Sequence, residues 1–197
     1  MSKADSTRLT ILHKAFELIY KNGYQATSID DILAMTKVTK GAFFYHFKNK
    51  DEMGLALINE VMYEAMYPSL IFPLLDAKDP LKEIYAMMKE LLLANPFMQV
   101  KYGCPANNLI QEMAPLSLRF SKSLSVLVDQ WEKALQAALT QGKKAGLVRN
   151  DINTKQAANF IMSGYGGVRI LGRLHSDKKT YTVYLKELKR YLEEMKY

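Results

Sequence analysis

The residues that could carry out chemistry in this chain are few and widely separated. The 197 residues contain one cysteine, Cys104, and three histidines, which lie in separate segments. A zinc site needs several converging Cys, His or acidic ligands, and acid–base catalysis needs paired titratable groups. We therefore expect no metal, no cofactor and no enzymatic activity. A helical enzyme remains an alternative, although its remaining candidates, Glu90, Glu112 and Asp129, are better explained as surface or capping charges.

Basic side chains gather near the N-terminus. The chain carries a formal charge of +7, and residues 1–50 hold eight Lys or Arg against four Asp or Glu. A basic segment of this kind indicates either a surface that binds a polyanion such as DNA or an ordinary solvated surface. Charge alone does not separate these two interpretations.

The overall composition predicts a folded, cytoplasmic protein. Hydrophobic residues make up 49% and charged residues 24% of the chain, which excludes a disordered chain. The longest run without a charged residue, 156–168, has 13 residues, whereas a membrane-spanning helix needs about 20. Residues 1–5 contain no apolar core of a secretory signal, and a single cysteine excludes a disulfide framework. We expect no membrane association.

Hydrophobic residues recur at helical spacing along nearly the whole chain. Leu12, Phe16 and Ile19 lie on one face of a first helix, which is expected to be capped at residue 5 or 6 and to end at Gly23. Two short helices follow, separated by a tight turn at residues 36–38. This arrangement is typical of a helix-turn-helix.

The helices after residue 50 are expected to be longer. The fourth helix opens at Asn49 and runs to about Tyr67, where Pro68 and Pro73 are expected to break it. Further helices are expected to begin at Pro80, at Pro105, after Pro115, after Asn153 and near Tyr181. No strand or repeat is evident. The predicted fold is all-α, with a three-helix DNA-binding head at residues 1–50 and a larger effector-binding and dimerisation domain at residues 51–197.

The third helix has the size and surface of a recognition helix. Thr39 caps it, and Phe43 and Phe47 face inward at a spacing of four residues. A helix fits the major groove of B-DNA, where Lys and apolar side chains contact base edges. This helix is expected to present Lys40, Ala42, Phe44, Tyr45 and His46 outward toward DNA, and the side chains expected to hold phosphates are Thr27, Thr39, Lys48 and Lys50. The alternative is a small helical subdomain with a solvated basic face.

The segment Thr27–Met53, TSIDDILAMTKVTKGAFFYHFKNKDEM, resembles the N-terminal signature of TetR-type transcriptional regulators. The resemblance covers about residues 8–60. It implies a bacterial homodimeric repressor that a small ligand releases from a palindromic operator. It also implies base contacts from Lys40, Ala42, Phe44 and Tyr45, phosphate contacts from Thr27, His46 and Lys50, and core positions for Phe43 and Phe47.

Two positions depart from this signature. Lys37, also a candidate to face DNA, stands where the turn usually carries Gly, so it must adopt a positive φ or shift the turn. Phe44 stands where Tyr is usual, so one polar contact to DNA is missing. These departures keep open a second interpretation, a ligand-binding or interaction dimer with a degenerate head.

The resemblance implies that the last two helices form a homodimer interface. Ser163–Gly172 is rich in glycine, and Tyr181–Met195 carries a stripe of Tyr and Leu. The two segments could pack as a four-helix interface across a twofold axis. Close packing within one chain is the alternative explanation for the glycines.

The body also offers side chains for a small apolar or electrophilic effector. An apolar cavity with a few polar groups suits a drug-like ligand, although a Met and aromatic stripe is more often ordinary core. The candidate ligand-binding residues are Met88, Leu91, Phe97, Tyr102, Cys104, Asn107, Asn108, Phe120 and Trp131.

Cys104 has two interpretations. It precedes Pro105 at the expected start of a helix, where the dipole and free amides favour a reactive thiolate. The segment 103–107 resembles one in the N-ethylmaleimide-responsive subgroup of the same family. A buried, unreactive thiol is the alternative, because free cysteines are usually buried. The expected partners are therefore double-stranded DNA, a second copy of the chain and a small effector.

Overall fold

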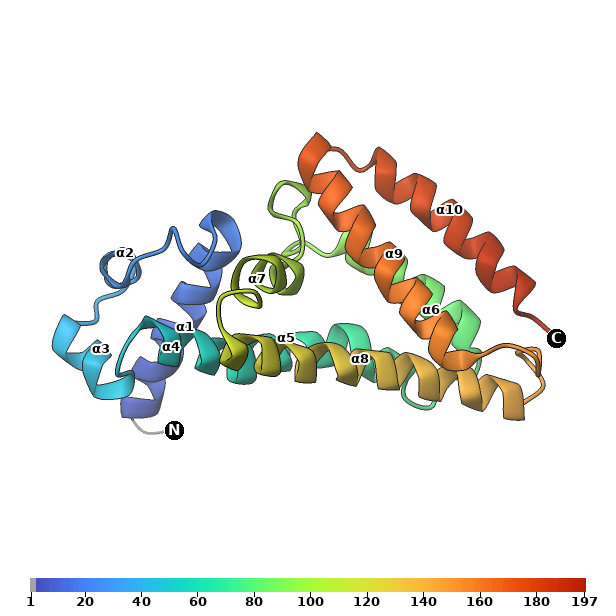
Figure 1. Ribbon diagram of the computed structural model, residues 1–197, viewed down its shortest axis with the longest axis horizontal. Coiled ribbons are helices and arrows are strands. Elements are labelled where there is room, and N and C mark those ends of the chain that lie inside the picture. The colour runs from blue at the N-terminus through green and yellow to red at the C-terminus, as the bar shows by residue number, and fades with distance from the viewer. Residues whose placement is uncertain (1–2) are drawn as a thin grey trace. The chain divides into compact units, whose positions relative to one another are not determined.

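A computed structural model describes residues 3–197, and in that range it contains helices and no strand (Figure 1). The β-type pairing described there is one isolated antiparallel bridge between Val148 and Lys196. The all-α prediction is confirmed. None of the helices in this range combines the length and the hydropathy that crossing a bilayer requires. The prediction about a secretory signal falls partly on Met1 and Ser2, which lie outside the described residues.

The chain divides into two compact units, which are described separately. The first comprises the residues up to Ala65 together with Pro105–Val126, and the second comprises Met66–Cys104 and Leu127–Tyr197. The helix α7 (Pro105–Met113) therefore belongs to the same unit as the N-terminal helices. The predicted division at residue 50 concerns function and stays a prediction.

The N-terminal helices of the first unit surround a small apolar core. Helices α2 (Ile29–Ala34) and α3 (Lys40–His46) pack against α1 (Lys3–Asn22), as Figure 1 shows. Phe43 and Phe47 are buried as predicted, and their ring centroids lie 5.5 Å apart. Hence the opposite face of α3 is turned outward.

Helix α1 ends where the sequence predicts, but it begins earlier. Gly23 ends the helix with a φ of 96°, a left-handed conformation that glycine adopts without strain. At the other end, the helix already includes Lys3. The predicted cap at residue 5 or 6 is therefore wrong.

Short polar side chains set the boundaries of the short helices. The Ser28 hydroxyl accepts a hydrogen bond from the Asp31 amide at 3.0 Å, and the Asp31 carboxylate accepts one from the Ser28 amide at 2.8 Å. The Ser28 hydroxyl and amide lower the pKa of the Asp31 carboxyl below its ordinary value. Thr39 caps α3, and Asn49 caps α4 (Lys50–Ala56), as predicted.

The helix that starts with α4 continues past its predicted end. Its successive segments are α4, a π-helical stretch (Leu57–Met62), α5 (Tyr63–Met66), a second π-helical stretch (Tyr67–Ile71) and a 3-10 turn (Phe72–Leu74). Pro68 lies in the first turn of the second π-helical stretch. The wider hydrogen-bond pattern there accommodates the missing amide hydrogen of a proline. The predicted break at Pro68 is therefore wrong, and helical structure ends after Leu74.

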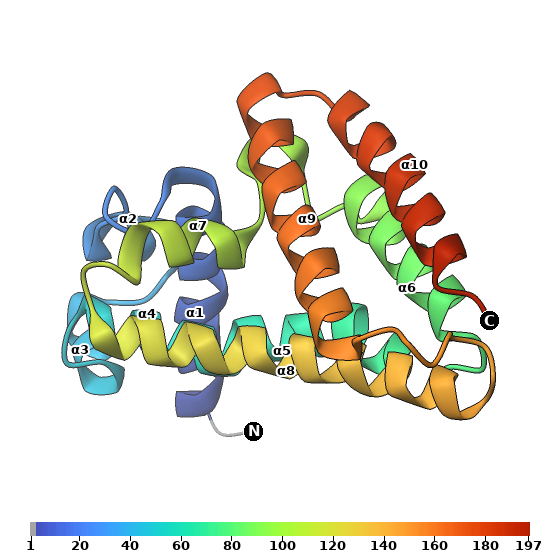
Figure 2. The same cartoon turned by 45° about the vertical axis from the view of Figure 1, so that its right-hand side comes forward.

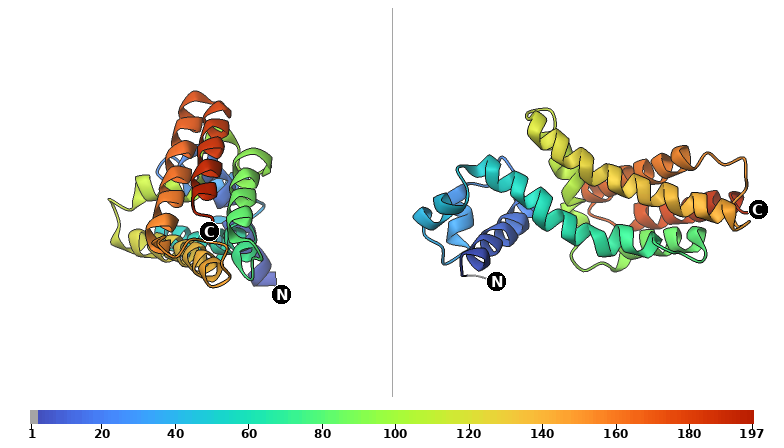
Figure 3. Two further views of the ribbon diagram at one scale, coloured as in Figure 1. Left: turned by 90° about the vertical axis from the view of Figure 1, so that its right-hand side faces the viewer. Right: turned by 90° about the horizontal axis from the view of Figure 1, so that it is seen from below.

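The second unit is built on long helices. They are α6 (Pro80–Lys89) with its π-helical extension (Glu90–Ala94), most of α8 (Leu118–Lys144), α9 (Thr154–His175) and α10 (Lys179–Glu194), with a 3-10 turn at Val100–Tyr102. Helix α10 packs against both α6 and α9, and the three lie side by side in Figures 2 and 3. Met88, Leu135, Ile161 and Tyr181 are fully buried in this unit.

Two glycines allow α9 and α10 to approach each other closely. A Cβ atom added to Gly164 would lie 2.6 Å from the Tyr184 ring, and one added to Gly172 would lie 2.3 Å from the Tyr181 ring. Gly167 has nothing within 4 Å of the same position. Packing within one chain therefore explains Gly164 and Gly172, whereas Gly167 lies on an open face of α9.

Candidate DNA-binding surface and buried polar cluster

The outward face of α3 presents two large aromatic side chains. Phe44 is 47% exposed and Tyr45 is 79% exposed. Adjacent exposed aromatic side chains on a short helix commonly mark a surface that contacts another molecule. Both residues were predicted to contact DNA bases, and both are accessible to do so.

Lys40, at the first position of α3, is also accessible. Its Nζ donates to the Asp30 carboxylate at 3.1 Å, and both side chains are more than half exposed. Exposed ion pairs contribute little to stability, and salt screens them. The ammonium group can therefore exchange this partner for a guanine or a phosphate at small cost.

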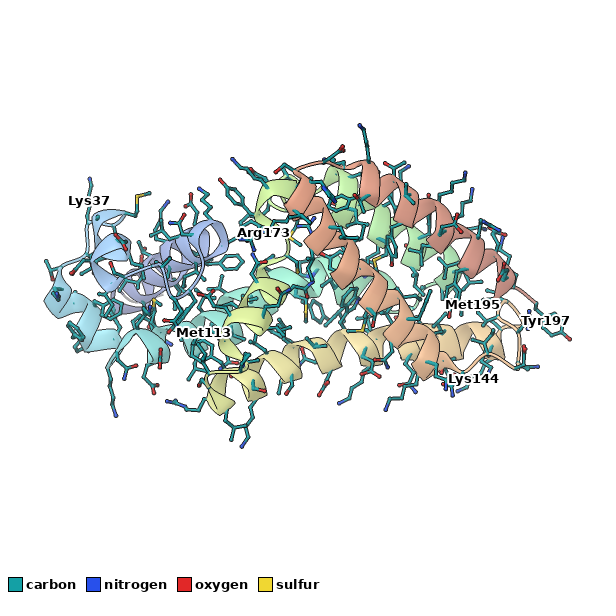
Figure 4. The ribbon with its side chains drawn as sticks, turned by 45° about the horizontal axis from the view of Figure 1, so that its top comes forward. Lys37, Met113, Lys144, Arg173, Met195 and Tyr197 are labelled. Atoms are coloured by element: carbon teal, nitrogen blue, oxygen red, sulfur yellow. The ribbon has the colours of Figure 1, made fainter. Side chains whose placement is uncertain are left out.

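Lys37 projects from the turn between α2 and α3 (Figure 4). Among the residues that the structure describes, the non-glycine residues with positive φ are Asp76 and Ser176. Lys37 therefore occupies a shifted turn without left-handed backbone, the second of the two outcomes expected from the sequence. Thr39 and Lys48 are exposed as well, while Ala42 and His46 are partly exposed.

Two candidates for phosphate contacts are engaged inside the protein. Thr27 is 1% exposed, and its hydroxyl donates to the Gly23 carbonyl at 2.7 Å. The Lys50 Nζ donates to the carbonyls of Tyr24 and Thr27 at 3.1 and 3.2 Å and lies over the Tyr24 ring. In this conformation both side chains hold the turn before α2. Lys50 keeps one ammonium hydrogen to donate, and the phosphate contacts of Thr27 and Lys50 stay predictions.

A groove in the first unit places further basic side chains beside α3, together with Glu52, whose carboxylate forms an ion pair with Arg119 at 2.8 Å. The groove has a volume of about 560 Å³. Its lining includes His46 and Lys48 at the end of α3, Arg8 from α1, and Arg119 and Lys122 from the start of α8. Sequence reasoning missed these last three residues, because only folding brings them beside α3.

The turn that orients α2 is held by a residue from α7. The Glu112 carboxylate accepts hydrogen bonds from the amides of Tyr24 and Gln25, at 2.8 and 2.6 Å. The Tyr24 hydroxyl donates to Asp51 at 2.7 Å, and burial together with this carboxylate raises the pKa of Tyr24. Glu112 was expected to be a surface or capping charge, and it binds the backbone amides of a turn and so connects α7 to the helix-turn-helix.

The nine candidate ligand-binding residues are divided between the two units. Asn107, Asn108 and Phe120 belong to the first unit, where the Phe120 ring lies 5.0 Å from that of Tyr24. The other six belong to the second unit. Phe97 is 43% exposed there, whereas the structure buries Met88, Leu91, Cys104 and Trp131.

Cys104 lies in a cluster of buried polar side chains in the second unit. The Trp131 and Tyr165 ring centroids are 5.3 Å apart, and Tyr165 is hydrogen-bonded to the Cys104 thiol. Burial, with a further contribution from Cys104, raises the pKa of Tyr165. Arg169 is fully buried beside them, with its guanidinium 5.5 Å from the Tyr181 ring centroid. Neither Tyr165 nor Arg169 was a candidate, since no sequence pattern distinguishes a buried arginine on a helix from an exposed one.

Two segments of the chain match known protein families. Residues 11–57 match the family described as "Bacterial regulatory proteins, tetR family". Residues 79–188 match the family described as "Tetracyclin repressor-like, C-terminal domain". Together the two matches cover most of the chain.

Known regulators resemble the chain over most of its length. It is 24% identical over 182 residues to the HTH-type transcriptional repressor DhaR of a Mycobacterium species, covering 90% of this chain and 88% of that protein. It is 33% identical over 173 residues to the HTH-type transcriptional regulator TtgR of Pseudomonas putida, covering 84% and 80%. A TetR transcriptional regulator from Chloroflexus aurantiacus shares the fold, with a TM-score of 0.89 at 22% identity over 100% of this chain and 98% of that one.

Proposed function

Because the chain belongs to the tetR family of bacterial regulatory proteins, it is a ligand-responsive DNA-binding regulator, and we propose that it acts as a homodimeric repressor. In this proposal α3 reads a palindromic operator, α9 and α10 hold the dimer together, and a small effector bound in the second unit releases the DNA. The relatives are transcriptional regulators, and no catalytic step is proposed. The site of action is the bacterial cytoplasm, where the operator DNA is.

The observation that carries the proposal is the exposed face of α3. Phe44 and Tyr45 are accessible on the side opposite the buried Phe43 and Phe47. Lys40 lies at the start of the helix, and Lys48 lies just after its end. Aromatic and basic groups on a helix that fits the major groove provide both base contacts and phosphate contacts.

An exposed apolar stripe on α9 supports the proposed dimer interface. Phe160, Leu171 and Leu174 are all substantially exposed, and Leu174 reaches 73%. They recur at helical spacing with the open Gly167, and Val183 on α10 is also exposed. Apolar residues at such spacing on a twofold-related pair of helices form a self-complementary surface.

The proposed regulation is a coupling between effector binding and operator binding. A bound effector favours a state in which α4 tilts and the two copies of α3 separate. The helices then no longer match half-sites one turn of DNA apart, so the operator affinity falls. A coupling free energy of about 1–3 kcal/mol is typical and changes affinity by about 5- to 150-fold.

Selection of DNA from a random double-stranded pool by the full-length protein tests operator binding. The enriched sequences should be palindromic, with half-site centres about one helical turn apart. Affinity for the selected site should fall steeply with salt, because each phosphate contact releases condensed counterions. Absence of any enriched sequence, or salt-independent binding, would contradict the proposal.

A further inference from the structure

Arg169, in the C-terminal half of α9, is a buried charge without an acidic partner. Its side chain is fully buried, and among residues 3–197 no carboxylate forms an ion pair with it. Buried charges are normally paired, because transferring an unpaired ion out of water is costly. The guanidinium thus lacks the anion that usually accompanies it.

Neutral backbone carbonyls satisfy only part of this guanidinium. One terminal nitrogen donates to the Met98 carbonyl at 3.3 Å, and the other donates to the Gly103 carbonyl. The Nε–H of Arg169 is buried and has no hydrogen-bond partner. A guanidinium has five N–H donors in a rigid planar fork, so these two carbonyls leave it with unused donors.

The surrounding side chains are also short of acceptors. The Trp131 Nε1–H and the Tyr181 hydroxyl are buried, and neither donates to an acceptor. The polar neighbour of the Tyr181 hydroxyl is the Arg169 guanidinium, which is itself a donor. Tyr181 lies under the Arg169 guanidinium, and the Trp131 ring contacts Tyr165, whose hydroxyl is hydrogen-bonded to Cys104. The titratable neighbours of Arg169 in this cluster are the phenols of Tyr165 and Tyr181 and the thiol of Cys104, and none of them is a carboxylate. The cluster therefore offers a positive charge and unpaired donors to an acceptor that the chain itself does not supply.

We propose that Arg169 and Tyr181 bind the carboxylate of a small organic anion, with the rings of Trp131 and Tyr165 contacting its apolar part. The inference rests on the proposed function, because it names the chemical class of the effector. A planar carboxylate matches the guanidinium fork, and its second oxygen can accept from the Tyr181 hydroxyl. A single arginine balances one negative charge, and the aromatic neighbours favour an organic monoanion over the more highly charged phosphate.

The hydrogen bonds of Arg169 show how binding of such an anion could affect another segment of the chain. Met98 and Gly103, whose carbonyls Arg169 now binds, lie in the segment that leads directly into α7. A carboxylate competes with these carbonyls for the same guanidinium. Binding would therefore weaken the attachment of the segment that ends where α7 begins at Pro105.

Paired probes of equal shape and different charge test the site. Propanoate and benzoate are titrated into the full-length protein by calorimetry, with propanamide and benzamide as uncharged controls and inorganic phosphate as a competing anion. At least one carboxylate should bind saturably, at least tenfold more tightly than its amide and than phosphate. Equal affinity for carboxylate and amide, preferred binding of phosphate, or no carboxylate binding would overturn the proposal.

The Tyr181→Phe variant separates ligand binding from folding. Because the Tyr181 hydroxyl donates to no acceptor and its polar neighbour is the Arg169 guanidinium, its removal should leave the melting temperature without ligand nearly unchanged. The carboxylate affinity should nevertheless fall about three- to tenfold. Tyr191→Phe, on the same helix, is the matched control and should bind as the wild type does. Unchanged carboxylate affinity in Tyr181→Phe would remove Tyr181 from the site.

Arg169→Lys and Arg169→Gln complete the test. Lys keeps the charge and loses the fork, so binding should weaken, whereas Gln loses both and should abolish the preference for carboxylate over amide. Carboxylate preference retained in a folded Arg169→Gln protein would overturn the proposal. Operator binding by wild-type protein without ligand is measured in parallel. If DNA binds and carboxylates do not, the effector class is wrong while the DNA-binding function stands.

Discussion

At the scale of single residues, the outward face of α3 and the buried polar cluster around Arg169 place their positive charges in different environments, one in water and one in the protein interior. Lys40 and Tyr45 are exposed. Without DNA, Lys40 forms a weak ion pair with Asp30 and Tyr45 is solvated, and the proposed DNA contacts would replace both. Arg169 is enclosed by aromatic rings and backbone carbonyls, so its charge acts where the dielectric constant is low. Substitutions at the two places should therefore have different consequences.

Lys40→Ala and Asp30→Ala form a matched pair, since each removes one side of the same exposed ion pair. Lys40→Ala should lower operator affinity about tenfold, the usual effect of losing one specific base contact. Asp30→Ala should leave affinity unchanged or raise it, because it frees the ammonium group. Fluorescence anisotropy with the selected operator measures both, and equal losses in the two variants would exclude a base contact from Lys40.

Cys104 is 7% exposed and hydrogen-bonded to Tyr165, so reagents should reach its sulfur slowly. We expect iodoacetamide to alkylate native Cys104 at least tenfold more slowly than a small model thiol at pH 7, and at the model rate after unfolding. Mass spectrometry of timed samples gives both rates. A native rate equal to or above that of the model thiol would instead support a reactive sensor.

At the scale of helices, function depends on how neighbouring elements are held. Glu112 attaches α7 to the turn before α2, and the capping box of Ser28 then starts α2 at a defined residue. Glycines set the distance between α9 and α10 in the second unit. These contacts join segments far apart in sequence, so each can be tested by a conservative change.

Glu112→Gln should reduce both stability and operator affinity. The carboxylate accepts from two backbone amides, and an amide side chain offers only one oxygen and no charge. We expect the free energy of unfolding to fall by about 1–2 kcal/mol, as for a lost charge-assisted hydrogen bond. Urea denaturation measures the loss. Glu187→Gln on the exposed face of α10 should change neither quantity. A wild-type free energy of unfolding for Glu112→Gln would show that the contact between Glu112 and the two amides does not stabilise the protein.

Gly164→Ala should destabilise the second unit, and Gly167→Ala should not. The added methyl at Gly164 would lie 2.6 Å from the Tyr184 ring, so the helices must separate at a cost of about 1–3 kcal/mol. At Gly167 nothing lies within 4 Å, and alanine favours the helix by up to about 1 kcal/mol. Thermal unfolding compares the two variants, and equal effects would contradict the packing argument.

At the scale of the whole molecule, regulation of DNA binding requires two copies of α3 at a fixed separation. The exposed apolar stripe on α9 is the surface that we propose to pair two chains. A dimer doubles the number of DNA contacts, so a change far from α3 that weakens pairing also weakens operator binding.

Leu174→Glu should therefore convert the dimer into monomers and abolish tight operator binding. Leu174 is 73% exposed, so the substitution should leave the fold of each chain intact. Phe72→Glu, at a side chain that is 64% exposed outside the stripe, is the control and should remain dimeric. Sedimentation equilibrium measures the assembly state. A dimeric Leu174→Glu protein would place the interface elsewhere.

Periodicity and capping residues were sufficient to predict the all-α class, the three-helix head and the inward face of α3. These features depend on residues three or four positions apart, which the order of amino acids specifies directly. The accessible aromatic pair at Phe44 and Tyr45 followed from the same local pattern.

Only the tertiary structure decided which polar side chains are buried or form hydrogen bonds inside the protein. It buries Thr27, directs Lys50 to two backbone carbonyls, and brings Glu112 from 88 positions away to the Tyr24 amide. It also encloses Arg169, which a helical pattern alone would leave as one more surface charge. The reason is physical: burial and hydrogen-bond partners depend on contacts between distant segments, and no local spacing encodes those contacts.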